Sequence, residues 1–125
     1  MPEKQQHILL IEDDPTLADI TAFRLELLGY RVSTLHTAEE ALVWLADQLP
    51  DLLVVGHFLP GMDGIEFLNR ISNDMRTSEL PTMLVSPNSE LDDVQKAFNA
   101  GADEYLVTPF DPRVLEQKTA HLAGF

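Results

Sequence analysis

The sequence of 125 residues contains no cysteine. Disulfide bonds, thiolate metal sites and cysteine nucleophiles are therefore excluded. Long apolar runs are also missing, because no stretch approaches the roughly 20 residues that a membrane-spanning helix needs. The N-terminus has no basic segment followed by an apolar one, which a secretory signal would require. These absences predict a soluble, cytoplasmic protein.

Basic residues are scarce as well. The chain has 8 lysines and arginines against 21 aspartates and glutamates, which gives a formal net charge of −13 at pH 7. Such an acidic surface disfavours direct contact with nucleic acid and with an anionic membrane. Any binding to DNA would have to come from another domain or from a partner.

What the sequence does contain is a regular alternation of short apolar runs with segments of helical periodicity. We predict strands at 7–11, 31–35, 52–55, 82–85 and 104–107. We predict helices at about 15–28, 38–49, 64–74, 91–100 and 112–122. The connections are short, so the right-handed crossover rule predicts one α/β domain over residues 1–125, with a doubly wound parallel sheet and helices on both faces.

Capping signals support the predicted helix starts. Asp14, Asp63 and Asp111 each precede a helical segment and can act as N-cap residues, and Thr37 with Glu40 forms a capping box. The second helix is expected to bury the residues Ala41, Leu42, Leu45 and Leu49.

The carboxyl ends of the strands converge at one edge of a sheet of this kind. The residues expected there are Glu12, Asp13, Gly56, Ser86 and Thr108. Two carboxylates about 5 Å apart repel by about 3 kcal/mol at an effective dielectric constant of about 20, so Glu12 and Asp13 would attract a divalent cation or a proton and repel phosphate. The chain has no glycine-rich loop and no Gly-Lys-Ser/Thr motif that could hold a nucleotide.

Six segments, in their order and spacing, resemble a response-regulator receiver domain over essentially the whole chain. They are residues 9–14 (LLIEDD), 29–30 (GY), 40–42 (EAL), 50–52 (PDL), 59–64 (LPGMDG) and 100–110 (AGADEYLVTPF). The resemblance implies a flavodoxin-like fold of five strands in the order 2-1-3-4-5. It also implies a place in two-component signalling.

The chain departs from the receiver pattern at three positions. In the family, an aspartate four residues before the proline of the LPGMDG segment accepts a phosphoryl group from a histidine kinase, and Gly56 occupies that position. The family's lysine before the proline of the fifth-strand turn corresponds to Thr108. Pro87 follows the fourth-strand hydroxyl residue and has no N–H with which to bind a phosphoryl oxygen. The positions that match the family are Glu12, Asp13, Ser86 and Tyr105, the last at the place of its aromatic switch residue.

We interpret the chain as a degenerate receiver, or pseudo-receiver, that is not an enzyme and cannot use an aspartyl-phosphate switch. We expect a protein-interaction module that works without phosphorylation, through the surface of residues 90–122. Its expected partner is another protein or a second copy of the chain, in a homodimer. No cofactor is required, and at most weak Mg²⁺ binding is expected at Glu12 and Asp13. The chain is also compatible with being the N-terminal part of a longer protein.

Two alternatives stay open. Either His57 or Ser86 accepts a phosphoryl group in place of the missing aspartate, or the vacated pocket binds a small ligand or an ion. Side chains alternate along a strand, so His57, next to Gly56, is expected to point away from the pocket unless the backbone bends there. Tyr105 is either a switch residue that faces a partner or an ordinary strand residue with its hydroxyl in solvent.

Overall fold

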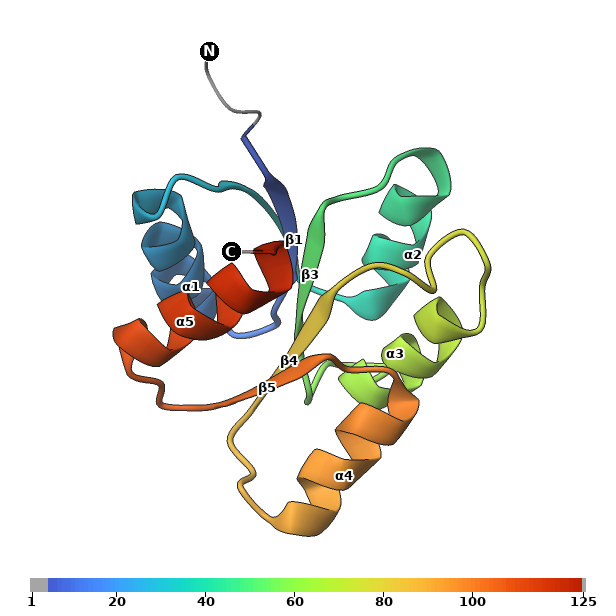
Figure 1. Ribbon diagram of the computed structural model, residues 1–125. Helices are drawn as coiled ribbons and strands as arrows, with labels where there is room; N and C mark the ends of the chain where they lie inside the picture. The colour runs from blue at the N-terminus through green and yellow to red at the C-terminus, as the bar shows by residue number, and fades with distance from the viewer. Residues whose placement is uncertain (1–4, 125) are drawn as a thin grey trace.

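The computed structural model describes residues 5–124 and shows a five-stranded parallel sheet covered by helices (Figure 1). The strands are β1 (His7–Ile11), β2 (Arg31–Leu35), β3 (Leu52–Gly56), β4 (Thr82–Ser86) and β5 (Glu104–Val107). The helices are α1 (Pro15–Leu27), α2 (Ala38–Asp47), α3 (Gly64–Ser72), α4 (Leu91–Ala100) and α5 (Pro112–Ala123). Residues 1–4 and 125, which the single-domain prediction includes, lie outside the described residues.

The strand order is β2-β1-β3-β4-β5, and every neighbouring pair is parallel. The predicted doubly wound α/β fold and its strand order are therefore confirmed. In Figure 1, α1 and α5 cover one face of the sheet, and α2, α3 and α4 cover the other. Within residues 5–124, no helix combines the length and the apolar character needed to cross a bilayer.

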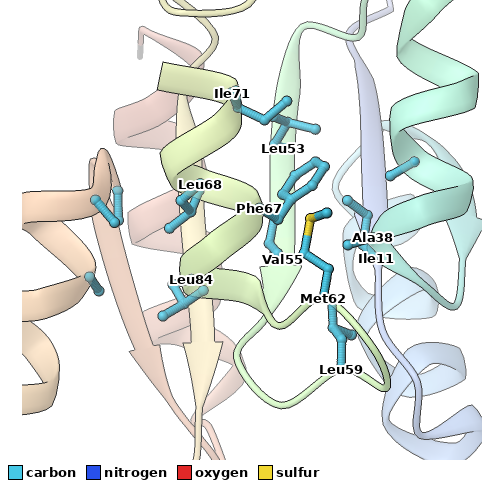
Figure 2. Close-up of a cluster of buried hydrophobic side chains, with 14 of the residues drawn as sticks. Ile11, Ala38, Leu53, Val55, Leu59, Met62, Phe67, Leu68, Ile71 and Leu84 are labelled. Atoms are coloured by element: carbon cyan, nitrogen blue, oxygen red, sulfur yellow. The ribbon is translucent and has the colours of Figure 1, made fainter. Parts of the chain in front are cut away.

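Two apolar clusters hold the layers together, one on each face of the sheet. Side chains alternate along β1 and β3, so each strand contributes to both clusters. Ile11 and Val55 pack with Phe67 of α3 on one face, where Figure 2 shows them. Leu10 and Val54 pack with α1 and α5 on the other face. The central strands are buried on both faces, as their unbroken apolar runs predict.

The predicted helix starts are confirmed by hydrogen bonds. Oδ1 of Asp14 accepts from the backbone N–H groups of Thr16 and Leu17, at 2.9 and 3.2 Å. Thr37 and Glu40 form the expected capping box. Side chains of Asp63 and Asp111 likewise cap α3 and α5.

The prediction that the second helix buries Leu49 is wrong. Leu49 is 45% exposed, whereas Ala41 and Leu45 are buried. The helix ends at Asp47, and Gln48 is already extended, with φ −156° and ψ 160°. Leu49 therefore lies in the connection to β3, where the helical periodicity that predicted its burial no longer applies.

A buried histidine stands at the opposite edge of the sheet from the predicted site. Nδ1 of His7 lies 3.0 Å from Nη2 of Arg31, which donates, and Nε2 lies 2.7 Å from Oγ of Ser33. The ring also meets Trp44 edge-on, with ring centroids 5.5 Å apart. Burial lowers the pKa of His7 and the charge of Arg31 lowers it further, while Asp51 opposes both effects.

His7 predicts a loss of stability in mild acid. The pKa of His7 in the folded protein lies below the ordinary value of about 6.5. The neutral ring therefore contributes fully to the free energy of unfolding above that pH, and this contribution is lost as the pH falls through the folded pKa. We expect His7→Gln to narrow the difference in unfolding free energy between pH 7.5 and pH 5.5, measured by urea denaturation. If the free energy of unfolding fell by the same amount between pH 7.5 and pH 5.5 in His7→Gln and in the natural chain, His7 would not be the source of the acid sensitivity.

Candidate functional site

The carboxyl edge of the sheet carries a hollow of about 280 Å³. It lies where β1, β3, β4 and β5 end, which is where parallel α/β sheets bind ligands. The described residues that line it are Glu12, Asp14, Leu17, His57, Phe58, Val85, Pro87 and Thr108. The predicted pocket is therefore present, with a lining that differs in part from the expected one.

The space of the missing phosphoacceptor is occupied by Glu12. A Cβ atom at Gly56 would lie 2.9 Å from Oε1 of Glu12 and 3.4 Å from the carbonyl oxygen of Ile11. Glu12 is only 8% exposed, and its Oε2 accepts a hydrogen bond of 3.0 Å from the backbone N–H of Asp14. The glutamate carboxylate thus folds over Gly56, which offers no side chain to hold it away.

The carboxylate of Glu12 faces like charges. Burial raises the pKa of Glu12, the backbone N–H groups of Asp14 and Asp13 lower it, and the charges of Asp14 and Asp13 raise it again. The side chain of Asp13 is exposed and does not line the hollow, whereas Asp14, which caps α1, does. The carboxylates at the hollow are accordingly Glu12 and Asp14, in place of the expected Glu12 and Asp13.

The prediction that His57 points away from the pocket is wrong. His57 is 9% exposed, lines the hollow, and its Nδ1 lies 2.9 Å from Oγ of Ser86. Its ring stacks on Phe58, with centroids 4.2 Å apart and planes 10° from parallel. Strand β3 ends at Gly56, and the chain bends from His57 onward, so the alternation of a regular strand does not extend to this residue.

Ser86 is sealed beneath the hollow. Its side chain is fully buried, and Oγ accepts a hydrogen bond of 3.1 Å from the backbone N–H of Asn88 in addition to its contact with His57. A hydroxyl held in this way supports the local backbone and the imidazole. A phosphoryl donor in the hollow would reach His57 before it reached Ser86.

Two of the positions that bind the phosphoryl group in receiver domains, Thr108 and Pro87 in this chain, line the hollow. Thr108 lines the hollow at the end of β5, and its N–H donates to the carbonyl oxygen of Ser86 at 3.0 Å. Pro87 lines the hollow directly after the carboxyl end of β4 and has no N–H. The residues that line the hollow include no lysine or arginine, so it has no fixed positive side chain with which to bind phosphate.

Tyr105 is turned into the protein. Its ring is 6% exposed, and its hydroxyl donates a hydrogen bond of 2.7 Å to the carbonyl oxygen of Asn88, in the loop between β4 and α4. The alternative that placed its hydroxyl in solvent is therefore wrong. The ring does not face outward toward a partner either, and its role as a switch residue stays a prediction. The contact joins β5 to the loop that follows Ser86.

The predicted interaction surface, residues 90–122, carries apolar side chains in solvent. Leu91 is 77% exposed, Phe98 is 44% exposed and Val107 is 38% exposed. Glu104 joins β5 to α5 through Lys118 at 3.0 Å and His121 at 2.7 Å. Burial opposes the ionisation of Glu104, but hydrogen bonds from these two partners lower its pKa below the ordinary value.

Helix α1 carries a further exposed apolar stripe that the sequence interpretation did not identify. Ile20 is 49% exposed, Phe23 is 59% exposed and Leu27 is 62% exposed, at helical spacing on one side. The sequence contains a signal for this stripe: apolar residues occur on more sides of the helix than one buried face can cover, so some of them must be exposed.

The residues at the hollow do not fit a tight Mg²⁺ site. Mg²⁺ prefers an octahedron of oxygen ligands, and Gly56 supplies none from a side chain. Across residues 5–124 there is no group of three or more histidines, aspartates or glutamates arranged to hold a metal ion. Asp13, one of the two expected ligands, points into solvent rather than into the hollow.

Comparison with known proteins identifies response-regulator relatives. A family model described as response regulator receiver domain matches residues 8–120. The chain is 39% identical over 111 residues to the transcriptional regulatory protein AfsQ1 of Streptomyces coelicolor. The aligned region covers 89% of this chain and 48% of that protein. The chain spans about half the length of the curated relatives it matches first, for example 43% of RpaA from Synechocystis.

Solved structures agree with this result. The receiver domain of the sensor histidine kinase PA1611 from Pseudomonas aeruginosa superposes with a TM-score of 0.89 at 26% identity, covering 98% of this chain and 100% of that one. The chemotaxis response regulator CheY4 of Vibrio cholerae has a TM-score of 0.89 at 22% identity, covering 95% and 99%. The second likeness supports the fold alone.

Proposed function

The chain belongs to the response regulator receiver domain family of two-component signalling, and within that family we propose that it acts as a pseudo-receiver: a non-enzymatic protein-interaction module that works without phosphorylation. The observation that carries the proposal is the pair of Gly56 and Glu12. The first offers no carboxylate to attack phosphorus, and the second fills the space where one would begin. Phosphoryl transfer needs a nucleophile, a metal ion and a cation placed together.

The other two departures point in the same direction. Thr108 brings a short uncharged hydroxyl where the family has a lysine, and Pro87 offers no N–H to a phosphoryl oxygen. Glu12 and Asp14 add negative charge to the same hollow, and that charge repels an incoming phosphoryl group. The changes at Thr108 and Pro87 each weaken phosphate binding independently of the missing aspartate.

Signalling would then depend on contact with a protein partner or a second copy. The exposed apolar residues Leu91, Phe98 and Val107 make the surface of residues 90–122 suitable for such a contact. Tyr105 sits behind that surface and is tied to the loop above the hollow. A partner or a ligand that binds two conformations of this loop unequally would shift their populations without any phosphoryl group.

A second candidate is a receiver that accepts a phosphoryl group on His57. The observation that favours it is the position of the imidazole, which lines the hollow instead of facing away. Ser86 is less suitable, because it is fully buried and its Oγ is already bonded. His57 still lacks a metal ion and a lysine beside it, so it ranks second.

No cofactor is required for a module of this kind. The PA1611 receiver domain is described with a magnesium ion coordinated in its active-site cleft. In this chain the same region offers Glu12 in the hollow and Asp13 in solvent, so Mg²⁺ would keep most of its water and bind weakly.

The proposal predicts that acetyl phosphate and Mg²⁺ leave the mass of the chain unchanged in intact-protein mass spectrometry. The missing nucleophile is the physical reason. A receiver that retains the aspartate, labelled in parallel, is the control. A mass gain of one phosphoryl group on a residue of the hollow would overturn the proposal; acid-labile phosphate would identify His57 and acid-stable phosphate Ser86.

A further inference from the structure

The hollow at the carboxyl edge contains two carboxylates and has no lysine or arginine in its lining. The side chain of Glu12 is only 8% exposed. The side-chain charges that act on it are those of Asp13 and Asp14, and both are negative. Buried charges in proteins are normally paired with an opposite charge. Both Glu12 and Asp14 line the hollow, and the lining includes His57 but no lysine or arginine.

The rest of the wall is largely apolar. Leu17, Phe58 and Val85 line the hollow beside the carboxylates. Phe58 is 57% exposed although it is a large aromatic residue, and a stacked contact with His57 fixes its ring at this position. His57 covers one face of the ring, and an aromatic side chain beside carboxylates is a surface that attracts organic cations through its ring electrons.

We propose that this hollow binds a small organic ammonium ion, with its charged nitrogen against Glu12 and Asp14 and its apolar body against Phe58 and Leu17. The inference rests on the proposed function, because the site is available only if it no longer processes phosphate. The ligand class follows from three properties of the lining: two carboxylates, no fixed positive charge, and apolar walls. The volume of about 280 Å³ suits a ligand of a few carbon atoms, just below the range of drug-sized sites.

Other ligand classes fit the hollow less well. A phosphate or a carboxylate would meet Glu12 and Asp14 with no lysine or arginine in the lining to offset their charge. A bare divalent ion would need more oxygen ligands than the hollow supplies, and it would gain nothing from Phe58 or Leu17. An organic ammonium ion uses the charged and the apolar parts of the wall together.

The proposal can be tested by calorimetric titration of the protein with n-butylammonium chloride at pH 8. We expect saturable binding that sodium butyrate, with the same carbon chain and the opposite charge, does not reproduce. Glu12→Gln keeps the size of the side chain and an oxygen that can accept from the N–H of Asp14, but it removes the charge. We expect it to weaken butylammonium binding about tenfold, which is the effect of losing one charge-assisted hydrogen bond.

Two controls separate a site from general attraction to an acidic surface. Glu116→Gln removes an exposed charge on α5 outside the hollow lining, and it should leave the affinity unchanged. Phe58→Ala should weaken binding through the lost aromatic contact. The inference would be overturned if butylammonium did not bind, or if Glu116→Gln weakened its binding as much as Glu12→Gln does. It would also be overturned if butyrate bound to the protein, or if MgCl₂ bound more tightly than butylammonium. The phosphorylation assay is read separately by mass, so failure here leaves the proposed function intact.

Discussion

The double variant Gly56→Asp with Thr108→Lys is expected to bind Mg²⁺ about tenfold more tightly than the natural chain, because the number and charge of carboxylate ligands set the affinity of such sites. The backbone at Gly56 accepts a side chain without strain, since its φ is not among the positive values recorded for Gly29, Gly61, Gly101 and Gly124. The atom nearest to a new Cβ is Oε1 of Glu12 at 2.9 Å, at the far end of a flexible side chain that one hydrogen bond, from the N–H of Asp14 to Oε2, holds in place. Glu12 can therefore swing aside while the main chain stays in place. Titration with MgCl₂ followed by calorimetry measures the change.

The matched controls assign the gain to the site. Thr108→Lys alone adds a positive charge without a ligand and should not raise the affinity for Mg²⁺. Asn99→Asp adds one carboxylate on the exposed side of α4 and should leave the affinity unchanged. If the double variant binds Mg²⁺ no better than the natural chain, the geometry at the end of β3 has diverged further from other receivers than the position of Glu12 indicates.

The fold was predictable because local and global signals agree along most of the chain. The unbroken apolar runs at β1 and β3 indicate strands buried on both faces, and such strands require helices on both sides of the sheet. Proline directly after the N-cap residues Asp14 and Asp111 marks the starts of α1 and α5. Leu49 was misplaced because the apolar periodicity continues beyond the last helical residue, and sequence spacing alone does not locate the end of a helix.

The site was predictable in position but not in detail. The topology alone places the residues after β1, β3, β4 and β5 at one edge of the sheet. The orientation of His57 depends on where β3 ends, and a shift of one residue at a strand end reverses the side on which a side chain lies. The position of the Glu12 carboxylate over Gly56 could not be predicted from motif positions, since a family pattern shows which residue is missing and not what fills the space it leaves.

Substitution of Phe67 by alanine is expected to lower the free energy of unfolding by about 3–5 kcal/mol, the cost of emptying a large aromatic site in a packed core. Phe67 is fully buried, and Figure 2 shows it between α3 and the central strands, close to Leu53, Val55 and Met62. A loss of this size is a large part of the 5–15 kcal/mol that typically separates folded from unfolded domains. Urea denaturation measures it, with Phe23→Ala as the control: Phe23 is 59% exposed on α1, so its removal opens no cavity and should cost less than 1 kcal/mol. A cost for Phe67→Ala as small as that for Phe23→Ala would mean that Phe67 does not pack α3 onto the central strands as tightly as its full burial indicates.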